Sequence, residues 1–288
     1  MQLTHENSPF ELNYSLNCKG TLVDLSTPKV MGILNLTPDS FFDGGRYQEE
    51  DRLLKQAEKL LEDGADFLDL GAFSSRPGAK LITESEEAER LIPALKALVK
   101  HFPKVLFSID TYRSSIAKKA VEEGACMIND ISGGKFDEQM FATISDLKVP
   151  YVMMHIQGKP ENMQDKPTYD NVVKELFIYF KSQLDRLHAL GVQDVIVDPG
   201  FGFGKTLAHN YQILKNMRHF QQLKVPILAG LSRKGMIQKV IQADAQHALN
   251  GTTAANVLAL LNGANILRVH DAKEAKEAIQ IVDYYQKH

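Results

Sequence analysis

The feature that most constrains the fold of this chain is a regular alternation of short apolar runs with longer amphipathic segments. Glycine just past a helix is a common stop signal because it tolerates left-handed backbone. Here glycine follows a helical pattern, with a strand-like run soon after, at four junctions: Asp63-Gly64, Glu123-Gly124, Leu190-Gly191 and Asn262-Gly263. Several strand-like runs are apolar without alternation, as in a parallel sheet buried on both faces. The pattern predicts one repeating β/α architecture.

Eight strands with following helices in about 260 residues match a (β/α)8 TIM barrel. The expected strands are Val30–Leu36, Phe67–Leu70, Val105–Ile109, Cys126–Asn129, Tyr151–Met154, Val195–Val197, Ile227–Ala229 and Asn265–Val269. The expected helices are Asp51–Asp63, Glu84–His101, Ser114–Glu123, Asn171–Leu190, Ala208–Phe220, Ala248–Asn262 and Ala272–Gln286. A doubly wound open sheet is the alternative. We divide the chain into residues 1–29, a short β-hairpin that closes the bottom of the barrel, and residues 30–288, the barrel.

The charge balance gives no general argument for a nucleic-acid or membrane partner. The chain has 33 basic and 36 acidic residues and a formal net charge of −3, so no field of one sign arises. No secretory signal or bilayer-spanning apolar run is seen, and we expect a cytoplasmic protein. Cys18 and Cys126 lack metal-ligand or CxxC spacing, which favours two free thiols over the alternative of one long-range disulfide.

Every expected strand delivers polar or ionisable groups at its C-terminal end, where barrel enzymes build their active sites. The groups include Asn35, Asp69, Asp110, Asn129, His155, Asp198, Ser232-Arg233-Lys234, Arg268 and His270. A single Asp or Asn after a strand is more often a turn former or helix cap, and we expect that role for Asp130 and Asp271. The whole set indicates catalysis.

Three of these groups suit a flat, nitrogen-rich heterocycle. Asp110, Asn129 and Asp198 come from different strands, and a buried carboxylate accepts two parallel N–H bonds from an amino group beside a ring N–H. Lys234 is placed to cover one face of such a ring, with Phe203 nearby.

A second subset suits an anion. Arg76, Arg268 and His270 offer N–H donors for phosphate. Asn35 supplies a neutral oxygen compatible with Mg²⁺, which takes few protein ligands when a diphosphate supplies others.

The glycine-rich stretch at residues 200–206 imitates a phosphate loop. Pro199 stands where the Walker A pattern requires glycine, and the alternating glycines do not fit the dinucleotide motif. We expect these glycines to allow a tight rim loop and a close ligand approach.

Long motifs in this chain resemble the signatures of the dihydropteroate synthase family. The resemblance runs from about Val30 to near the C-terminus. It rests on Met31–Phe41, Ser74–Ala79, Ile109-Asp110-Thr111, Ile128-Asn129-Asp130, Met154–Gly158, Asp198–Lys205, Ser232-Arg233-Lys234 and Arg268–Asp271.

The resemblance implies condensation of 6-hydroxymethyl-7,8-dihydropterin diphosphate with 4-aminobenzoate to give 7,8-dihydropteroate and diphosphate in folate synthesis. It implies pterin binding by Asp110, Asn129, Met154, Asp198, Gly230 and Lys234. It places diphosphate near Asn35, Arg76, Arg268 and His270, with Mg²⁺ at Asn35. It places 4-aminobenzoate near Ser75, Arg76, Pro77, Phe203 and Lys234, under loops 37–45 and 73–80. Catalysis is expected from Asp110, Lys234, Asn35 and Arg268, in a homodimer that sulfonamides target.

This sequence departs from many family members at three positions. Phe73 and Ser75 stand where Glu and Thr are common, and Gly235 stands where Ser is common, which affects the expected aminobenzoate site rather than the reaction class. A role for Asp39 in its loop is a further expectation. The alternatives are a pterin-binding methyltransferase domain of the methyltetrahydrofolate–corrinoid type and a catalytically silent pterin-binding or regulatory protein.

Overall fold

Eight parallel strands form a closed barrel in the computed structural model, which describes residues 14–36, 46–73 and 82–288. The strands run in the order β8-β7-β6-β5-β4-β3-β10-β9, and a parallel bridge between Val197 and Ile227 joins the two outer strands. Their bounds are β3 Lys29–Asn35, β4 Phe67–Gly71, β5 Leu106–Asp110, β6 Met127–Asp130, β7 Tyr151–Met154, β8 Val195–Asp198, β9 Leu228–Ala229 and β10 Ile266–Val269. The TIM barrel is therefore confirmed, and the open-sheet alternative is wrong.

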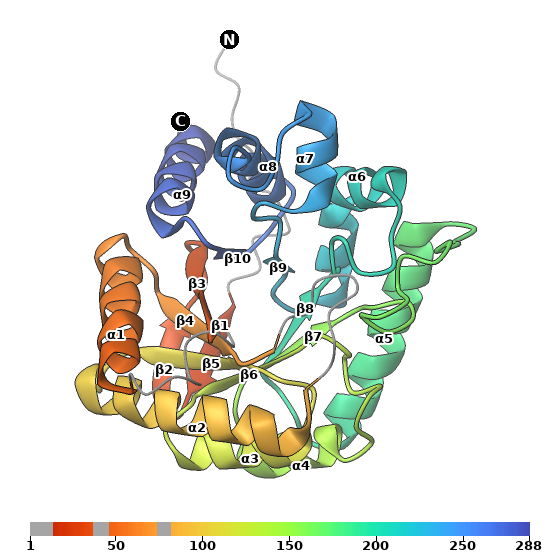
Figure 1. The fold of residues 1–288 in the computed structure, drawn as a ribbon. Helices are drawn as coiled ribbons and strands as arrows, with labels where there is room; N and C mark the ends of the chain where they lie inside the picture. Colours follow the sequence, from red (N-terminus) through yellow and green to blue (C-terminus); the bar gives the residue numbers. More distant parts are fainter. Residues whose placement is uncertain (1–13, 37–45, 74–81) are drawn as a thin grey trace.

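Helices surround the barrel as an outer ring (Figure 1). They are α1 Arg46–Glu62, α2 Glu84–His101, α3 Ser114–Glu122, α4 Met140–Leu147, α5 Val172–Ala189, α6 Leu207–Lys215, α7 Gly235–Ile241, α8 Leu249–Leu261 and α9 Ala272–Lys287. The expected helix Ala208–Phe220 is instead α6 followed by the 3-10 helix η2, Met217–Leu223. Helices α4 and α7 were not expected. Each ends at a left-handed residue other than glycine, Lys148 and Gln242, so the glycine stop signal is missing.

An antiparallel hairpin, β1 Ser15–Cys18 and β2 Thr21–Asp24, packs against the N-terminal ends of the barrel strands. Leu16, Cys18 and Leu25 share an apolar cluster, called the bottom cluster below, with inward side chains of the strands, namely Met31, Phe67, Met127, Val152, Ile196, Leu228 and Ile266. Cys18 and Cys126 both belong to this cluster as buried free thiols, as expected. The division of the chain at residue 30 stays a prediction.

The strand periodicity places the polar groups above that apolar layer. Residues two apart face the same side of a strand. In β4, Phe67 therefore lies in the bottom cluster and Asp69 faces the interior above it, while Leu68 and Leu70 pack outward into the core under the helices. The same alternation brings the polar side chains of neighbouring strands to the upper end of one barrel. In the described part of the chain, no helix is long and apolar enough to cross a membrane.

Candidate active site

A cavity of about 1090 Å³ opens at the C-terminal ends of the strands. Seven residues predicted from the sequence line it: Asn35, Asp110, Phe203, Gly230, Lys234, Arg268 and His270. Three others, Asn129, Met154 and Asp198, lie buried at the ends of β6, β7 and β8 without lining it. Ser75, Arg76, Pro77 and Asp39 lie outside the described residues. Most of the predicted site is therefore brought together.

Arg268 binds carboxylates of the barrel interior. Its Nε donates to Asp69 Oδ2 at 2.6 Å, and its NH2 donates to Asp110 Oδ2 at 2.9 Å. Predicted as a phosphate ligand, Arg268 thus also holds the expected pterin carboxylate. Burial raises the pKa of Asp110 to about 7, a shift that Arg268 opposes and the charge of Asp69 increases. Asp69, which sequence reasoning left without a role, therefore belongs to the site.

Lys234 joins the β9 loop to the glycine-rich loop after β8. Its Nζ donates to the carbonyl oxygen of Phe201 at 2.5 Å and lies 4.7 Å from the centroid of the Phe203 ring. A Cβ on Gly230 would lie 3.7 Å from this Nζ and 3.9 Å from Asp198 Oδ2, so the glycine leaves space between them. Burial lowers the pKa of Lys234 to about 8, opposed by the Asp198 carboxylate. The predicted grouping of Lys234 with Phe203 is therefore present.

Asp198 carries the complementary perturbation. Burial raises the pKa of its carboxyl group, and Lys234 is the main cation that opposes this shift. The backbone N–H of Gly200 donates to Asp198 Oδ1 at 2.7 Å, which fixes one carboxylate oxygen. The acid and the lysine therefore stabilise each other's charged form.

The glycine-rich stretch forms the tight rim loop that the sequence predicts. Gly200 and Gly204 have φ of +68° and +63°, and a Cβ on either would overlap a carbonyl oxygen of the neighbouring loop after β7. Lys205 locks the two loops together by donating to His155 Nδ1 at 3.1 Å and to the carbonyl oxygens of His155 and Phe203. These two glycines therefore allow the loop after β7 to approach closely, whereas the sequence predicted the close approach of a ligand.

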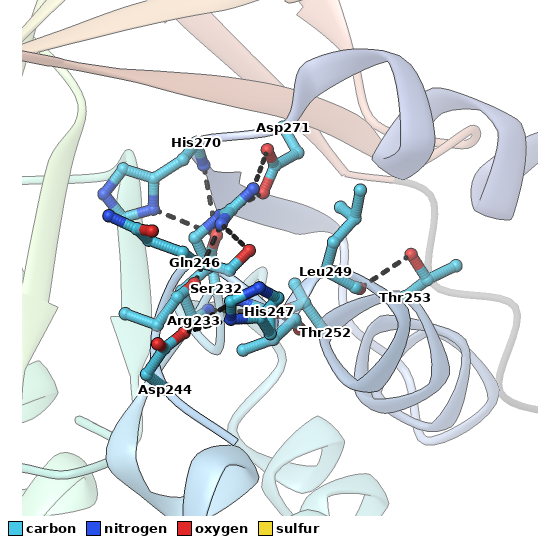
Figure 2. Close-up of polar contacts among 12 residues, drawn as sticks. Ser232, Arg233, Asp244, Gln246, His247, Leu249, Thr252, Thr253, His270 and Asp271 are labelled. Carbon is cyan, nitrogen blue, oxygen red and sulfur yellow. Dashed lines mark hydrogen bonds and ion pairs between the residues drawn. The ribbon is translucent and has the colours of Figure 1, made fainter. Parts of the chain in front are cut away.

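A second lock joins the ends of β9 and β10 (Figure 2). Arg233 donates from Nε and NH2 to both oxygens of Asp271 at 2.8 Å, and its NH1 donates to the carbonyl oxygens of Ala245 and Gln246. Ser232 Oγ lies 3.0 Å from His270 Nδ1. Asp271, expected to be a cap or turn former, occupies the N-cap position of α9, but its side chain makes no cap hydrogen bond and instead holds Arg233. The lock fixes the segments that carry Lys234 and His270.

Asp130 has the structural role expected of it. Its oxygens accept from the backbone N–H groups of Ser132 and Gly134, and from the hydroxyl of Tyr151 at 2.7 Å. It therefore shapes the turn after β6.

The departures from the family pattern fall at the edge of the cavity. Phe73 lines the cavity, and its ring meets Tyr112 edge to face at 5.3 Å. Tyr112 in turn meets Phe136 at 5.5 Å. Gly235 begins α7, and a Cβ there would have no atom within 4 Å. Phe73 thus makes an apolar contact where many family members have Glu, and the space beside Gly235 is open.

The fold and the site together define a class of protein: a (β/α)8 barrel with buried acids and a lysine gathered at the C-terminal ends of its strands. A family model for pterin binding enzymes matches residues 31–270. The dihydropteroate synthase of Escherichia coli K12 is 40% identical over 270 residues, covering 93% of this chain and 95% of that protein.

Solved structures agree. The Yersinia pestis dihydropteroate synthase in a sulfonamide drug complex has a TM-score of 0.89 and 39% identity, and the match covers 96% of this chain and all of that one. The Xanthomonas albilineans enzyme with 4-aminobenzoic acid has a TM-score of 0.88 and 36% identity, with coverage of 96% and 99%. The chain belongs to the dihydropteroate synthase family, and it is a transferase of folate biosynthesis.

Proposed function

We propose that the cavity carries out the family's reaction by dividing its residues among three ligands. As a dihydropteroate synthase, the chain transfers the pterin-methyl group of 6-hydroxymethyl-7,8-dihydropterin diphosphate to the amine of 4-aminobenzoate. The observation that carries the division is the contact between the two halves of the site, where Arg268 donates to Asp110. Acids that suit the pterin therefore lie directly beside cations that suit the diphosphate.

The pterin half consists of Asp110, Asn129, Asp198 and Lys234, with Met154 and Gly230 shaping the space. The two carboxylates accept N–H bonds from the ring and its amino group, because ionised carboxylates are acceptors only. Lys234 lies beside Asp198 and above the Phe203 ring, so it donates to the pterin and covers it. Aminobenzoate is assigned to the space near Phe203 and Lys234, together with Ser75, Arg76 and Pro77, which lie outside the described residues.

The diphosphate half consists of Asn35, Arg268 and His270, with Arg76 outside the described residues. Arg268 uses Nε and NH2 on Asp69 and Asp110, which leaves its NH1 group to face an anion. Ser232 Oγ beside His270 Nδ1 sets the orientation of the imidazole. These N–H groups stabilise negative charge as it develops on the leaving diphosphate.

Asn35 fits Mg²⁺ only as a shared ligand. The described residues contain no cluster of three His, Cys, Asp or Glu side chains that would hold a metal alone. Asn35 ends β3 with an exposed carboxamide at the cavity, and Mg²⁺ commonly combines one or two protein oxygens with substrate phosphates and water. When bound, Mg²⁺ neutralises charge on the departing diphosphate.

The bond changes follow from this arrangement. The C–O bond between the pterin-methyl carbon and diphosphate breaks, and its electron pair leaves with diphosphate. The electron-rich dihydropterin stabilises the carbon cation, assisted by the negative charge of Asp110. The amine lone pair then forms the C–N bond, and the extra proton passes from the nitrogen to the released diphosphate, so that the products balance the substrates. Exclusion of water protects the cation from hydrolysis.

A ligand comparison tests this division of roles. His270→Ala should weaken the pterin diphosphate complex at least fivefold more than the complex with 6-hydroxymethylpterin, which has no diphosphate. Asp198→Asn should weaken both complexes by the same factor. Calorimetry measures both affinities, and an equal effect of His270→Ala on the two ligands would contradict the assignment.

We propose that the chain forms a homodimer through α8 and α9, which lie side by side on the outside of the barrel (Figure 1). Ile281, Tyr284 and Tyr285 form an i, i+3, i+4 stripe on α9 and are 66%, 69% and 71% exposed. Tyr284→Glu should shift the sedimenting species from dimer to monomer. Leu22→Glu, at an equally exposed apolar position on the hairpin, should leave the dimer intact. A wild-type monomer would contradict the proposal.

A further inference from the structure

Asp69 is a buried carboxylate in the middle of β4 with no assigned role in ligand binding. Its side chain is fully buried and faces the barrel interior, between Phe67 of the bottom cluster and Gly71 at the rim. A buried charge is costly unless paired. The partners of Asp69 therefore indicate what it does.

One oxygen of Asp69 serves two groups of the site. Asp69 Oδ2 accepts from Asn129 Nδ2 at 2.9 Å and from Arg268 Nε at 2.6 Å. The contact of Asp69 Oδ2 with the Arg268 guanidinium is an ion pair, in which the acid is an ionised carboxylate. An ionised carboxylate has no hydrogen to donate, so only the NH2 end of Asn129 is able to face it. The carboxamide oxygen of Asn129 is thereby directed away from Asp69.

We infer that Asp69 is a positioning residue that makes Asn129 present an acceptor to the pterin and holds Arg268 between the pterin and diphosphate halves. The inference rests on the proposed function. With Asn129 in this orientation, Asp110, Asn129 and Asp198 all offer acceptor oxygens. The opposite orientation would set the amide N–H groups of Asn129 against the N–H groups of a dihydropterin, leaving donors without acceptors in a buried pocket.

Asp69 fixes Arg268 in the same way. Nε bonds to Asp69 and NH2 to Asp110, so two carboxylates on different strands set the plane of the guanidinium group. Without Asp69, Asp110 would be the remaining carboxylate partner of Arg268 in the described structure, and the guanidinium plane would be free to turn. Asp69 therefore orders both halves without touching either ligand.

A reciprocal swap tests the orientation argument. Asp69→Asn keeps the shape but no longer dictates which end of Asn129 faces it, and 6-hydroxymethylpterin should bind at least tenfold more weakly by calorimetry. The double variant Asp69→Asn/Asn129→Asp restores one carboxylate and one amide with their places exchanged. The new amide then donates to the carboxylate at position 129, whose other oxygen still faces the pterin, so binding should recover at least threefold.

Ser108→Ala is the matched control. Ser108 is the register partner of Asp69 on β5 and is fully buried, and within the described structure its Oγ makes no hydrogen bond. Its loss should change pterin affinity less than twofold. Asp69→Asn with wild-type affinity, or a swap that binds no more tightly than Asp69→Asn, would overturn the inference.

Two further measurements keep the outcome clear. If Asp69→Asn does not fold, Asn129→Asp alone provides the test. It sets a second carboxylate against Asp69 and should bind pterin at least tenfold more weakly, and wild-type affinity would overturn the inference. A wild-type protein that binds no pterin would instead contradict the proposed function.

Discussion

Lys234→Met gives a direct measure of what the lysine contributes to pterin binding. Methionine keeps the length and apolar body of the side chain but removes the ammonium group that lies near Asp198 and 4.7 Å from the Phe203 ring. A hydrogen bond from a charged group is worth about 1.5–3 kcal/mol, which corresponds to a loss of about 13- to 160-fold in affinity. The affinity for 6-hydroxymethylpterin, measured by calorimetry, should fall within that range.

The lost cation also changes Asp198. Lys234 is the main group that lowers the pKa of this buried acid, so removal of the lysine should raise the pKa of Asp198 further. As the pH is lowered, Asp198 of the variant should then become protonated, and pterin binding should weaken, at a higher pH than in the wild type. Lys239→Met is the control, because Lys239 lines the same cavity farther along α7 and should leave affinity within twofold. Pterin binding by Lys234→Met within twofold of wild type would refute the reasoning.

The pKa values and the glycine-rich loop give three further predictions. The pKa values of Asp110, about 7, and Lys234, about 8, predict a bell-shaped pH profile of kcat/KM. Activity rises as Asp110 ionises and falls as Lys234 loses its proton, and Asp110→Asn should change the acid limb, leaving only the part that the Asp198 carboxyl group contributes. An acid limb that Asp110→Asn leaves unchanged would contradict this assignment. The folded pKa of Asp110 also lies above its ordinary value of 3.8, so the stability that Asp110 contributes is lost as pH rises from about 4 to 7. In urea unfolding, Asp110→Asn should remove this pH-dependent loss of stability. Gly200→Ala should lower the free energy of unfolding by at least about 2 kcal/mol, since its Cβ meets backbone at φ +68°. Gly191→Ala, at φ +82° with no atom within 4 Å, should cost only about 1–2 kcal/mol of strain, and equal losses would contradict the role of the close contact.

The barrel could be predicted from the sequence because its signals are local. Helix–glycine–strand junctions and apolar runs recur along the whole chain, and they place each strand to within a residue or two of its observed bounds. Closure could not be predicted in this way. It depends on the bridge between Val197 and Ile227, next to a strand of only two residues, and no local pattern encodes that pairing.

The site follows the same division between local and long-range information. Groups at strand ends, such as Asp110 and Lys234, were predicted because barrel geometry brings all strand ends to one rim. Asp69 was named among the polar groups at the strand ends but was assigned no ligand, because its partners Asn129 and Arg268 come from other strands. The pairing of Arg268 with two acids and that of Arg233 with Asp271 depend on inter-strand register, with partners as many as 199 positions apart.

A coupled assay with pure protein, which follows release of diphosphate and formation of 7,8-dihydropteroate, tests most directly the claim that this chain is a dihydropteroate synthase. Incubated with 6-hydroxymethyl-7,8-dihydropterin diphosphate, 4-aminobenzoate and Mg²⁺, the protein should release diphosphate and form 7,8-dihydropteroate in equal amounts. Chelation of Mg²⁺ should stop both if, as we propose, the ion neutralises the departing diphosphate, because the carboxamide of Asn35 carries no positive charge of its own. Absence of both products in the presence of Mg²⁺ would contradict the account.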